Sequence, residues 1–175
     1  WVTTAALDGS TNAAPFSSYN YVAHSPPMLA INIGTRNGEL KDTARNILET
    51  LEFVVNVVTD DLVTLMDACS ADYPPGVSEL KRLGIETLPG RFVKAPRIAA
   101  SPIQMECRLD QAIRLGSGNN TLYIGQVLAF HLSPSVYDGR HIDAQRLRPL
   151  GRIGGPNYSR MGEIIRRQRL ASDVK

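Results

Sequence analysis

The longest regular pattern in the sequence is the alternation in IQMECRLDQAIRL, residues 103–115. Its odd positions are apolar except Gln111 and its even positions are polar except Ala112, which is the period of a strand with one buried face. The segment GSGNN then leads into TLYIGQVLAFHL, residues 121–132, whose lack of clean alternation predicts a strand covered on both faces. Two long strands joined by a short turn form an antiparallel ribbon, so the chain is restricted to folds that contain one.

Further strands are predicted before this ribbon. WVTTAALDGSTNAAPF carries the Asp8-Gly9 signal of a tight hairpin. After a polar stretch and a Pro-Pro breaker, MLAINI at residues 28–33 predicts another strand, and residues 53–58 predict one more. The fold class expected from these segments is mainly β, an antiparallel barrel with a few short helices.

The helices expected are short. Apolar residues at i, i+3, i+4 and i+7 predict a helix with Asp42 as its N-cap, and they are Ala44, Ile47, Leu48 and Leu51. DDLVTLMDAC predicts a second helix capped by Asp60 or Asp61, and residues 77–83 a third within a region rich in Pro and Gly. Apolar residues at 161, 164 and 165 suggest a last short helix near the C-terminus.

Length, charge and cysteine content limit the class of protein. A chain of 175 residues predicts one domain over 1–150, followed by a Gly- and Arg-rich extension over 151–175. The net charge of +2 gives no polybasic surface for nucleic acid or membrane, and no apolar stretch approaches the ~20 residues that span a bilayer. Cys69 and Cys107 are expected to be buried thiols of a reducing, cytoplasmic compartment. Because the chain starts at Trp1, its natural N-terminus is expected to be missing.

Several well-known sites are excluded or disfavoured. No P-loop sequence is present, and GSGNN joins two predicted strands, which does not fit a dinucleotide-binding turn between strand and helix. The three histidines show no metal-ligand spacing, so no metal is expected. No serine lies in G-x-S-x-G.

An anion site is one interpretation of the start of the first helix. Lys41 and Thr43 flank that start, where free N–H groups and the helix dipole favour a phosphate, and Arg36 lies just upstream. The alternative is that Lys41 and Arg36 are solvated loop charges and that the triplet only begins a helix. The residues alone leave both interpretations open.

Six fragments, in this order along nearly the whole chain, resemble one family. They are WVTT…DGSTNAAPFSSYN, SPPMLAINIG, KDTARNILETLEFVVNVV, SADYPPGVSEL, SPIQMECRL and LGRIGGPNY. Together they are similar to the flavin reductase-like, FMN-binding split-barrel family, which includes flavoredoxin and the reductase components of two-component monooxygenases such as the nitrilotriacetate system. The resemblance implies a homodimeric antiparallel split β-barrel with one FMN per subunit near the dimer interface, FAD being the alternative flavin.

The resemblance also implies a set of flavin-binding positions. The family's K-D-T stretch receives the FMN phosphate, NAAPFSS follows the isoalloxazine and ribityl chain, and G-G-S-x-Y of the extension approaches the flavin, with Pro156 here in place of Ser. The positions expected to bind flavin are therefore Asn12, Ala14, Phe16, Ser17, Ser18, Thr35, Arg36, Lys41, Asp42, Thr43, Asn46, Gly155 and Tyr158. Phe16 and Tyr158 are open to a second interpretation as packing residues, and Tyr73 either covers the ring or anchors its loop.

The implied activity is hydride transfer from NADH or NADPH to the flavin, for which no acid–base residue is required. Reduced flavin would then serve a partner oxygenase, and the extension would contribute to the flavin site or the dimer interface. Two alternatives remain, a flavoredoxin-like electron carrier and a non-catalytic FMN-binding protein.

Overall fold

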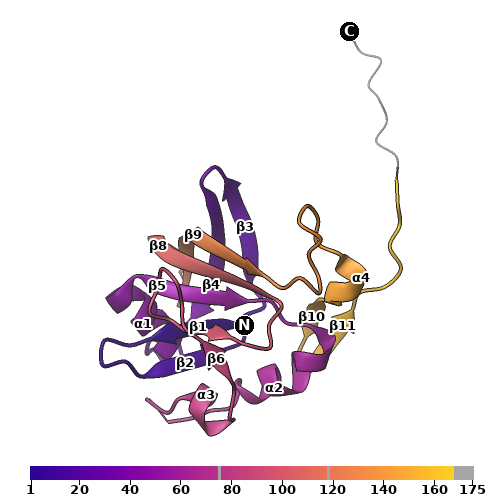
Figure 1. Cartoon of the computed structure of the whole chain (residues 1–175). Coiled ribbons are helices and arrows are strands. Elements are labelled where there is room, and N and C mark those ends of the chain that lie inside the picture. The colour runs from indigo at the N-terminus through magenta and orange to yellow at the C-terminus, as the bar shows by residue number, and fades with distance from the viewer. Residues whose placement is uncertain (75, 118, 168–175) are drawn as a thin grey trace.

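A seven-stranded antiparallel sheet dominates the computed structural model, which describes residues 1–74, 76–117 and 119–167 (Figure 1). Its strand order is β2-β1-β5-β8-β9-β4-β3. The strands are β1 (Val2–Ala5), β2 (Thr11–Ala14), β3 (Tyr19–His24), β4 (Pro27–Gly34), β5 (Glu52–Asn56), β8 (Ile103–Leu115) and β9 (Asn120–Leu132). Every neighbouring pair runs antiparallel, which confirms the mainly β, antiparallel prediction.

The other elements are short and lie around this sheet. Two small hairpin sheets are formed by β6 (Thr87–Leu88) with β7 (Arg97–Ile98) and by β10 (Leu150–Gly154) with β11 (Asn157–Arg160). The helical elements are α1 (Asp42–Thr50), the 3-10 turn η1 (Asp60–Leu62), α2 (Val63–Ala68), α3 (Glu79–Arg82) and α4 (Ala144–Leu147). The β10–β11 hairpin lies beside α4 at one end of the molecule (Figure 1). Among the described residues, every helix is too short or too polar to pass through a bilayer.

The predicted 103–132 hairpin is present as β8 and β9, with the turn where GSGNN indicates it. The predicted faces of these strands are wrong. Residues 103–107 are all buried, Gln104 and Glu106 included, whereas most of 108–115 is exposed. Residues 91–93 cover the second face of the first half, because their backbone N–H groups bind the Glu106 carboxylate. The second strand is not covered on both faces, since Gln126 and Phe130 are exposed.

Strand β3 was missing from the sequence prediction, which treated residues 19–24 as part of a polar stretch. It pairs with β4 from Tyr19 opposite Ile31 to His24 opposite Pro27. All of its residues except Ala23 are exposed. An edge strand without a buried face gives no alternation of apolar and polar residues, so the pattern that indicates a half-buried strand is absent here.

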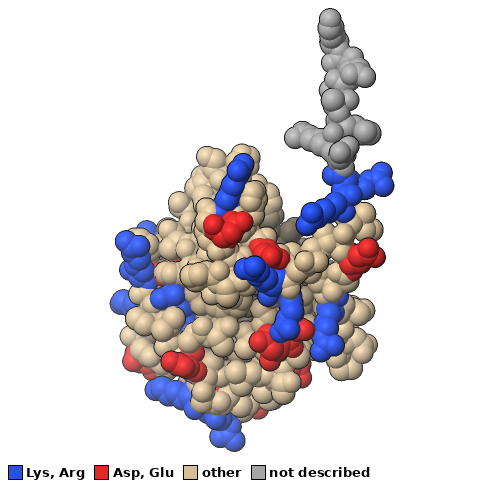
Figure 2. Space-filling view, turned by 45° about the vertical axis from the view of Figure 1, so that its right-hand side comes forward, with Lys and Arg blue, Asp and Glu red and all other residues tan. Residues whose placement is uncertain are grey.

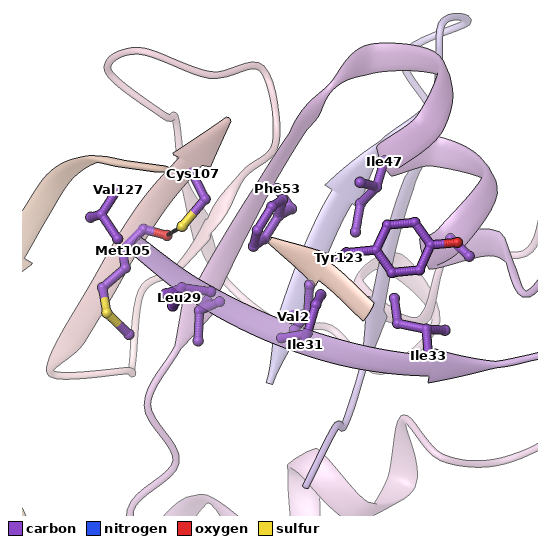
Figure 3. Close-up of a cluster of buried hydrophobic side chains, with 12 residues drawn as sticks. Val2, Leu29, Ile31, Ile33, Ile47, Phe53, Met105, Cys107, Tyr123 and Val127 are labelled. Carbon is purple, nitrogen blue, oxygen red and sulfur yellow. Dashed lines mark hydrogen bonds between the residues drawn. The ribbon is translucent and has the colours of Figure 1, made fainter. Parts of the chain in front are cut away.

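The main core lies between the sheet and α1 (Figure 3). Phe53 and Tyr123 are its largest fully buried side chains. Ile47 of α1 packs into it, whereas Leu48 and Leu51, which belong to the predicted apolar face, are 42% and 48% exposed. The remaining members are Val2, Leu29, Ile31, Ile33, Ala44, Val55, Met105, Cys107 and Val127. Both cysteines are buried free thiols, as expected.

The helix starts differ from the predicted caps. Lys41, not Asp42, is the N-cap of α1, with extended backbone at φ −66° and ψ 153°. The Asp42 carboxylate instead accepts hydrogen bonds from Arg45 and from the backbone N–H of Gly76. Thr59 precedes η1 in place of an aspartate cap. The helix suggested near the C-terminus is wrong, since residues 161–167 contain no helix.

The close packing of Gly125 against a core side chain predicts that a larger residue here destabilises the fold. A Cβ atom at this position in β9 would lie 2.5 Å from Cζ of the buried Phe53 ring. Gly125→Ala is therefore expected to lower the free energy of unfolding by about 1–3 kcal/mol through overpacking. Urea unfolding of this variant beside Gly162→Ala, where a Cβ meets nothing within 4 Å, measures the effect, and equal midpoints would contradict it.

Candidate functional site

A cleft of about 530 Å³ opens between the end of β2, the start of α1 and residues 69–73. This volume lies within the roughly 300–1,000 Å³ range of small-molecule sites. The lining residues come from segments far apart in the sequence, and they are Asn12, Ala14, Pro15, Phe16, Arg36, Asn37, Glu39, Leu40, Lys41, Asp42, Thr43, Arg45, Cys69, Ser70, Ala71, Tyr73 and Glu79.

The floor of the cleft is a buried chain of hydrogen bonds between three elements. The Asn12 amide donates from Nδ2 to both Glu79 carboxylate oxygens at 3.2 Å, and the backbone N–H of Ala13 donates to the same carboxylate at 3.0 Å. Asn12 Oδ1 accepts from the Thr43 hydroxyl at 2.7 Å and from the Thr4 hydroxyl at 3.3 Å. The chain therefore links α3, the β1–β2 hairpin and the first turn of α1.

Burial raises the pKa of two titratable groups that line the cleft, Glu79 and Cys69. Burial raises the pKa of the Glu79 carboxyl, the nearby Asp42 carboxylate adds to the rise, and hydrogen bonds from Ala13 and Asn12 oppose it. Burial also raises the pKa of the Cys69 thiol to about 12, so this thiol is protonated at neutral pH. The floor is polar and hydrogen-bonded but offers no reactive thiolate.

The cleft also carries positive charge. The side chains of Arg36, Lys41 and Arg45 all line it, beside the start of α1. Arg36 forms an ion pair with Asp72 at 2.7 Å, and Arg45 pairs with Asp42, whereas no carboxylate of the described residues pairs with Lys41. The first intrahelical bond runs from Arg45 N–H to the Lys41 carbonyl, so earlier N–H groups of the helix have no intrahelical acceptor.

On the face of the molecule shown in Figure 2, basic and acidic side chains are interleaved and form no extended field of one sign. This face therefore carries no continuous basic surface of the kind that binds a long polyanion.

The structure brings seven of the thirteen sequence-predicted positions together around the cleft. They are Asn12, Ala14, Phe16, Arg36, Lys41, Asp42 and Thr43. Thr43 is 1% exposed and its hydroxyl donates to Asn12, so this side chain fixes the first turn of α1 to β2. Tyr73 lines the cleft and also anchors its own loop, because its hydroxyl donates to the Ala68 carbonyl at 3.3 Å.

Four predicted positions lie near this cleft but do not line it. Asn46 is buried one turn into α1 and donates to the Thr4 hydroxyl at 2.9 Å. Ser17 and Ser18 are exposed before β3, and the Ser18 carbonyl accepts from Asn32 N–H at 2.9 Å. The Thr35 N–H donates to the Asn119 carbonyl at 3.0 Å.

Gly155 and Tyr158 lie in the β10–β11 hairpin, outside the lining of the cleft. Tyr158 packs against a second core cluster and donates from its hydroxyl to Asp67 of α2 at 2.7 Å. Arg152 donates to the same hydroxyl at 2.8 Å and stacks over the ring with 4.8 Å between guanidinium carbon and ring centroid. Within one chain, this hairpin therefore contacts α2, whose C-terminal end leads into cleft residues 69–73.

Five polar residues of the cleft were missing from the sequence prediction, and they are Asn37, Glu39, Arg45, Ser70 and Glu79. Arg45 follows Asp42 by three residues on a predicted helix, so the i,i+3 spacing of opposite charges was a usable signal. Glu79 is separated from its partner Asn12 by 67 residues. No local pattern connects them, and only the fold brings them together.

The cleft combines a helix start, three cations and two aromatic side chains. The family profile described as "Flavin reductase like domain" matches residues 1–147. An uncharacterized protein of Bacillus subtilis is 37% identical over 169 residues, covering 93% of this chain and 82% of the relative.

Two solved structures resemble the fold closely. Nitrilotriacetate monooxygenase component B from Bacillus cereus has a TM-score of 0.90 at 34% identity, covering 94% of this chain and 84% of that one. The 2-nitrobenzoate 2-nitroreductase of Pseudomonas fluorescens has a TM-score of 0.86 at 30% identity, covering 99% and 84%. With the profile extending over most of its length, the chain belongs to the flavin reductase like domain family.

Proposed function

We propose that this protein is a flavin reductase that binds FMN in the cleft and transfers hydride to it from NADH or NADPH. The single observation that supports this most strongly is the start of α1, which opens into the cleft beside Lys41 and Arg36. Backbone N–H groups, the positive end of the helix dipole and two cations suit the terminal phosphate of FMN.

The residues present fit the rest of FMN as well. The end of β2 provides the wall at Ala14 and Phe16, and Tyr73 provides an aromatic side chain from the facing segment. When bound, FMN supplies the acceptor for the hydride and its two electrons. The protein holds and orients the flavin, and the network of Asn12, Thr43 and Glu79 keeps the floor polar but internally satisfied.

The experiment that tests this function measures NADH and NADPH oxidation with and without added FMN. A flavin reductase is expected to show steady oxidation that depends on flavin and saturates with FMN concentration. A bound flavin that is reduced once without turnover would instead indicate an electron carrier. Protein that takes up no FMN after reconstitution would contradict the proposal in both forms. Transfer of the reduced flavin to an added flavin-dependent monooxygenase then tests the proposed partner.

A homodimer is part of this proposal, and a row across the sheet with two apolar side chains supports it. Ile113 of β8 pairs with Leu122 of β9, which pairs with Asn32 of β4, so the three side chains share one face. Ile113 is 39% exposed, and Asn32 Oδ1 is buried without a hydrogen-bond partner among the described residues. A second copy would cover the apolar side chains. The extension over 151–175, of which 168–175 lie outside the described residues, would contribute to the dimer interface or the flavin site.

Ile113→Asp is expected to convert the dimer into monomers, because it places a charge inside the covered face. Light scattering during gel filtration measures the mass, and Ile142→Asp, at an apolar side chain 45% exposed elsewhere, is the control. A wild-type monomer across micromolar concentrations would contradict the dimer. An Ile113→Asp dimer of unchanged stability would place the interface on another face.

A further inference from the structure

Glu79 is a buried carboxylate that hydride transfer to a flavin does not need. It is 7% exposed, it lines the cleft, and no described lysine, arginine or histidine forms an ion pair with it. A buried carboxylate without a cation is costly to maintain for packing alone. Its acceptors are instead satisfied by Asn12 and by the N–H of Ala13.

The carboxylate fixes which way the Asn12 amide points. A carboxylate only accepts hydrogen bonds, so both of its oxygens require the NH₂ group of Asn12 to face Glu79. The amide oxygen must then face the other way, where it accepts from the Thr43 hydroxyl at 2.7 Å. Glu79 therefore determines which atoms donate and which accept throughout the hydrogen-bonded network, from Glu79 through Asn12 to Thr43.

The two ends of this hydrogen-bonded network contact the two elements that border the cleft, β2 and α1. At one end, the bond to Ala13 N–H holds β2 directly before Ala14 and Phe16. At the other, Thr43 holds the first turn of α1, next to Lys41. The chain thus determines the distance between the wall at the end of β2 and the anion-binding start of α1.

We infer that Glu79 is a positioning residue, which acts through Asn12 and Thr43 to place the phosphate-binding start of α1 against the flavin-ring wall at β2. This inference rests on the proposed FMN site. It concerns the preference for a flavin with a phosphate, because a displaced helix start weakens contacts to the phosphate more than contacts to the ring.

The test compares FMN with riboflavin, which lacks the phosphate, by fluorescence titration of the full chain. In Glu79→Gln an amide NH₂ faces either Asn12 Nδ2 or Ala13 N–H, so one donor is left without an acceptor. We expect FMN affinity to fall about tenfold and riboflavin affinity by much less. A FMN-to-riboflavin affinity ratio equal to that of wild type would overturn the inference.

A compensating double variant separates positioning from general damage. In Asn12→Asp/Glu79→Gln, the new amide at position 79 donates to the new carboxylate at position 12, which still accepts from Thr43, while the amide oxygen accepts from Ala13 N–H. The wild-type affinity ratio is expected to return to within about threefold, since the carboxylate–amide pair is restored and the Thr43 hydroxyl and Ala13 N–H each keep an acceptor. Failure of the double variant to recover the ratio while Glu79→Gln has lost it would also overturn the inference.

Thr43, at the other end of the hydrogen-bonded network, provides a second test if Glu79→Gln does not fold. Thr43→Val removes only the last donor and is expected to lower the affinity ratio, whereas Thr43→Ser retains the hydroxyl and the ratio. An unchanged ratio in Thr43→Val would overturn the positioning role. If wild type binds FMN no better than riboflavin, the proposed phosphate site is wrong. If wild type prefers FMN and Glu79→Gln keeps that preference, only the positioning role of Glu79 is wrong.

Discussion

Replacement of Glu106 by glutamine is expected to lower the free energy of unfolding by about 2–4 kcal/mol. This carboxylate is fully buried and accepts backbone N–H groups from Arg91 at 2.8 Å, Phe92 at 2.6 Å and Val93 at 3.1 Å. It also contacts His131 Nε2 at 2.5 Å. Because both oxygens accept from the backbone, a glutamine NH₂ in either orientation faces an N–H group and leaves it unsatisfied.

The loss is expected to depend on pH. Burial alone would raise the pKa of the Glu106 carboxyl, but the N–H groups of Arg91 and Phe92, with His131 and Val93, outweigh it and lower the pKa below its ordinary value. Because the carboxyl has a lower pKa in the folded state, it stabilises the fold at pH values above its unfolded-state pKa of about 4.3. This stabilisation is lost as the pH falls through the folded-state pKa. The difference between wild type and Glu106→Gln should therefore be full at neutral pH and shrink in acid.

Urea unfolding at pH 7 and at acid pH measures both effects. Glu52→Gln is the matched control, because Glu52 accepts the N–H of Lys94 from the same loop at 2.7 Å but is only partly buried. Its loss should stay near or below about 1 kcal/mol. Equal destabilisation by the two variants, or a Glu106→Gln loss that does not vary with pH, would contradict the role assigned to this buried carboxylate.

Lys41→Ala is expected to weaken FMN binding by roughly tenfold to a hundredfold. The substitution removes a charge-assisted bond to the phosphate, worth about 1.5–3 kcal/mol. Riboflavin should bind the variant and wild type about equally, since it has no phosphate for Lys41 to contact. The apoprotein should unfold at nearly the same urea concentration, because a partly exposed lysine without an ion pair among the described residues contributes little to folding.

Flavin fluorescence titrations of FMN and riboflavin provide these four affinities. Lys81→Ala is the matched control, since Lys81 is an exposed lysine of α3 outside the cleft lining. Equal FMN affinity in Lys41→Ala and wild type would mean that Lys41, Asp42 and Thr43 only begin the helix and that the Lys41 charge is solvated. A parallel fall in riboflavin affinity would mean that the substitution disturbs the ring wall as well.

The parts of the fold that were predictable from the sequence are those set by local pattern. The β8–β9 hairpin has a period and a turn within 30 residues, and the Asp8-Gly9 hairpin has its turn signal, so both were expected. What covers a strand is not local. Gln104 and Glu106 have the polarity of exposed residues, but the loop at 91–93 and neighbouring side chains supply enough hydrogen bonds to bury them.

The candidate site shows the same division. The place of Lys41, Thr43 and Arg36 around a helix start suggested an anion site, with solvated loop charges as the alternative, whereas the other expected contacts depended on family resemblance. Glu79 could not be found either way, because a glutamate at the start of a short helix is ordinary in sequence terms. Its importance comes from the packing of α3 against β2, which places a buried acceptor opposite Asn12.

The order of strands in the sheet has a consequence for the newly made chain. β8 and β9 occupy the middle of the sheet, with β5 bonded to one side of them and β4 to the other. During synthesis, β1, β2 and β5 can pair with one another, and β3 with β4, but the sheet hydrogen bonds that connect these two groups run through β8 and β9, which are made last. A ribosome-bound chain that stops before β8 is therefore expected to expose strand edges and depend on chaperones, whereas one that includes β9 can close the core in one step.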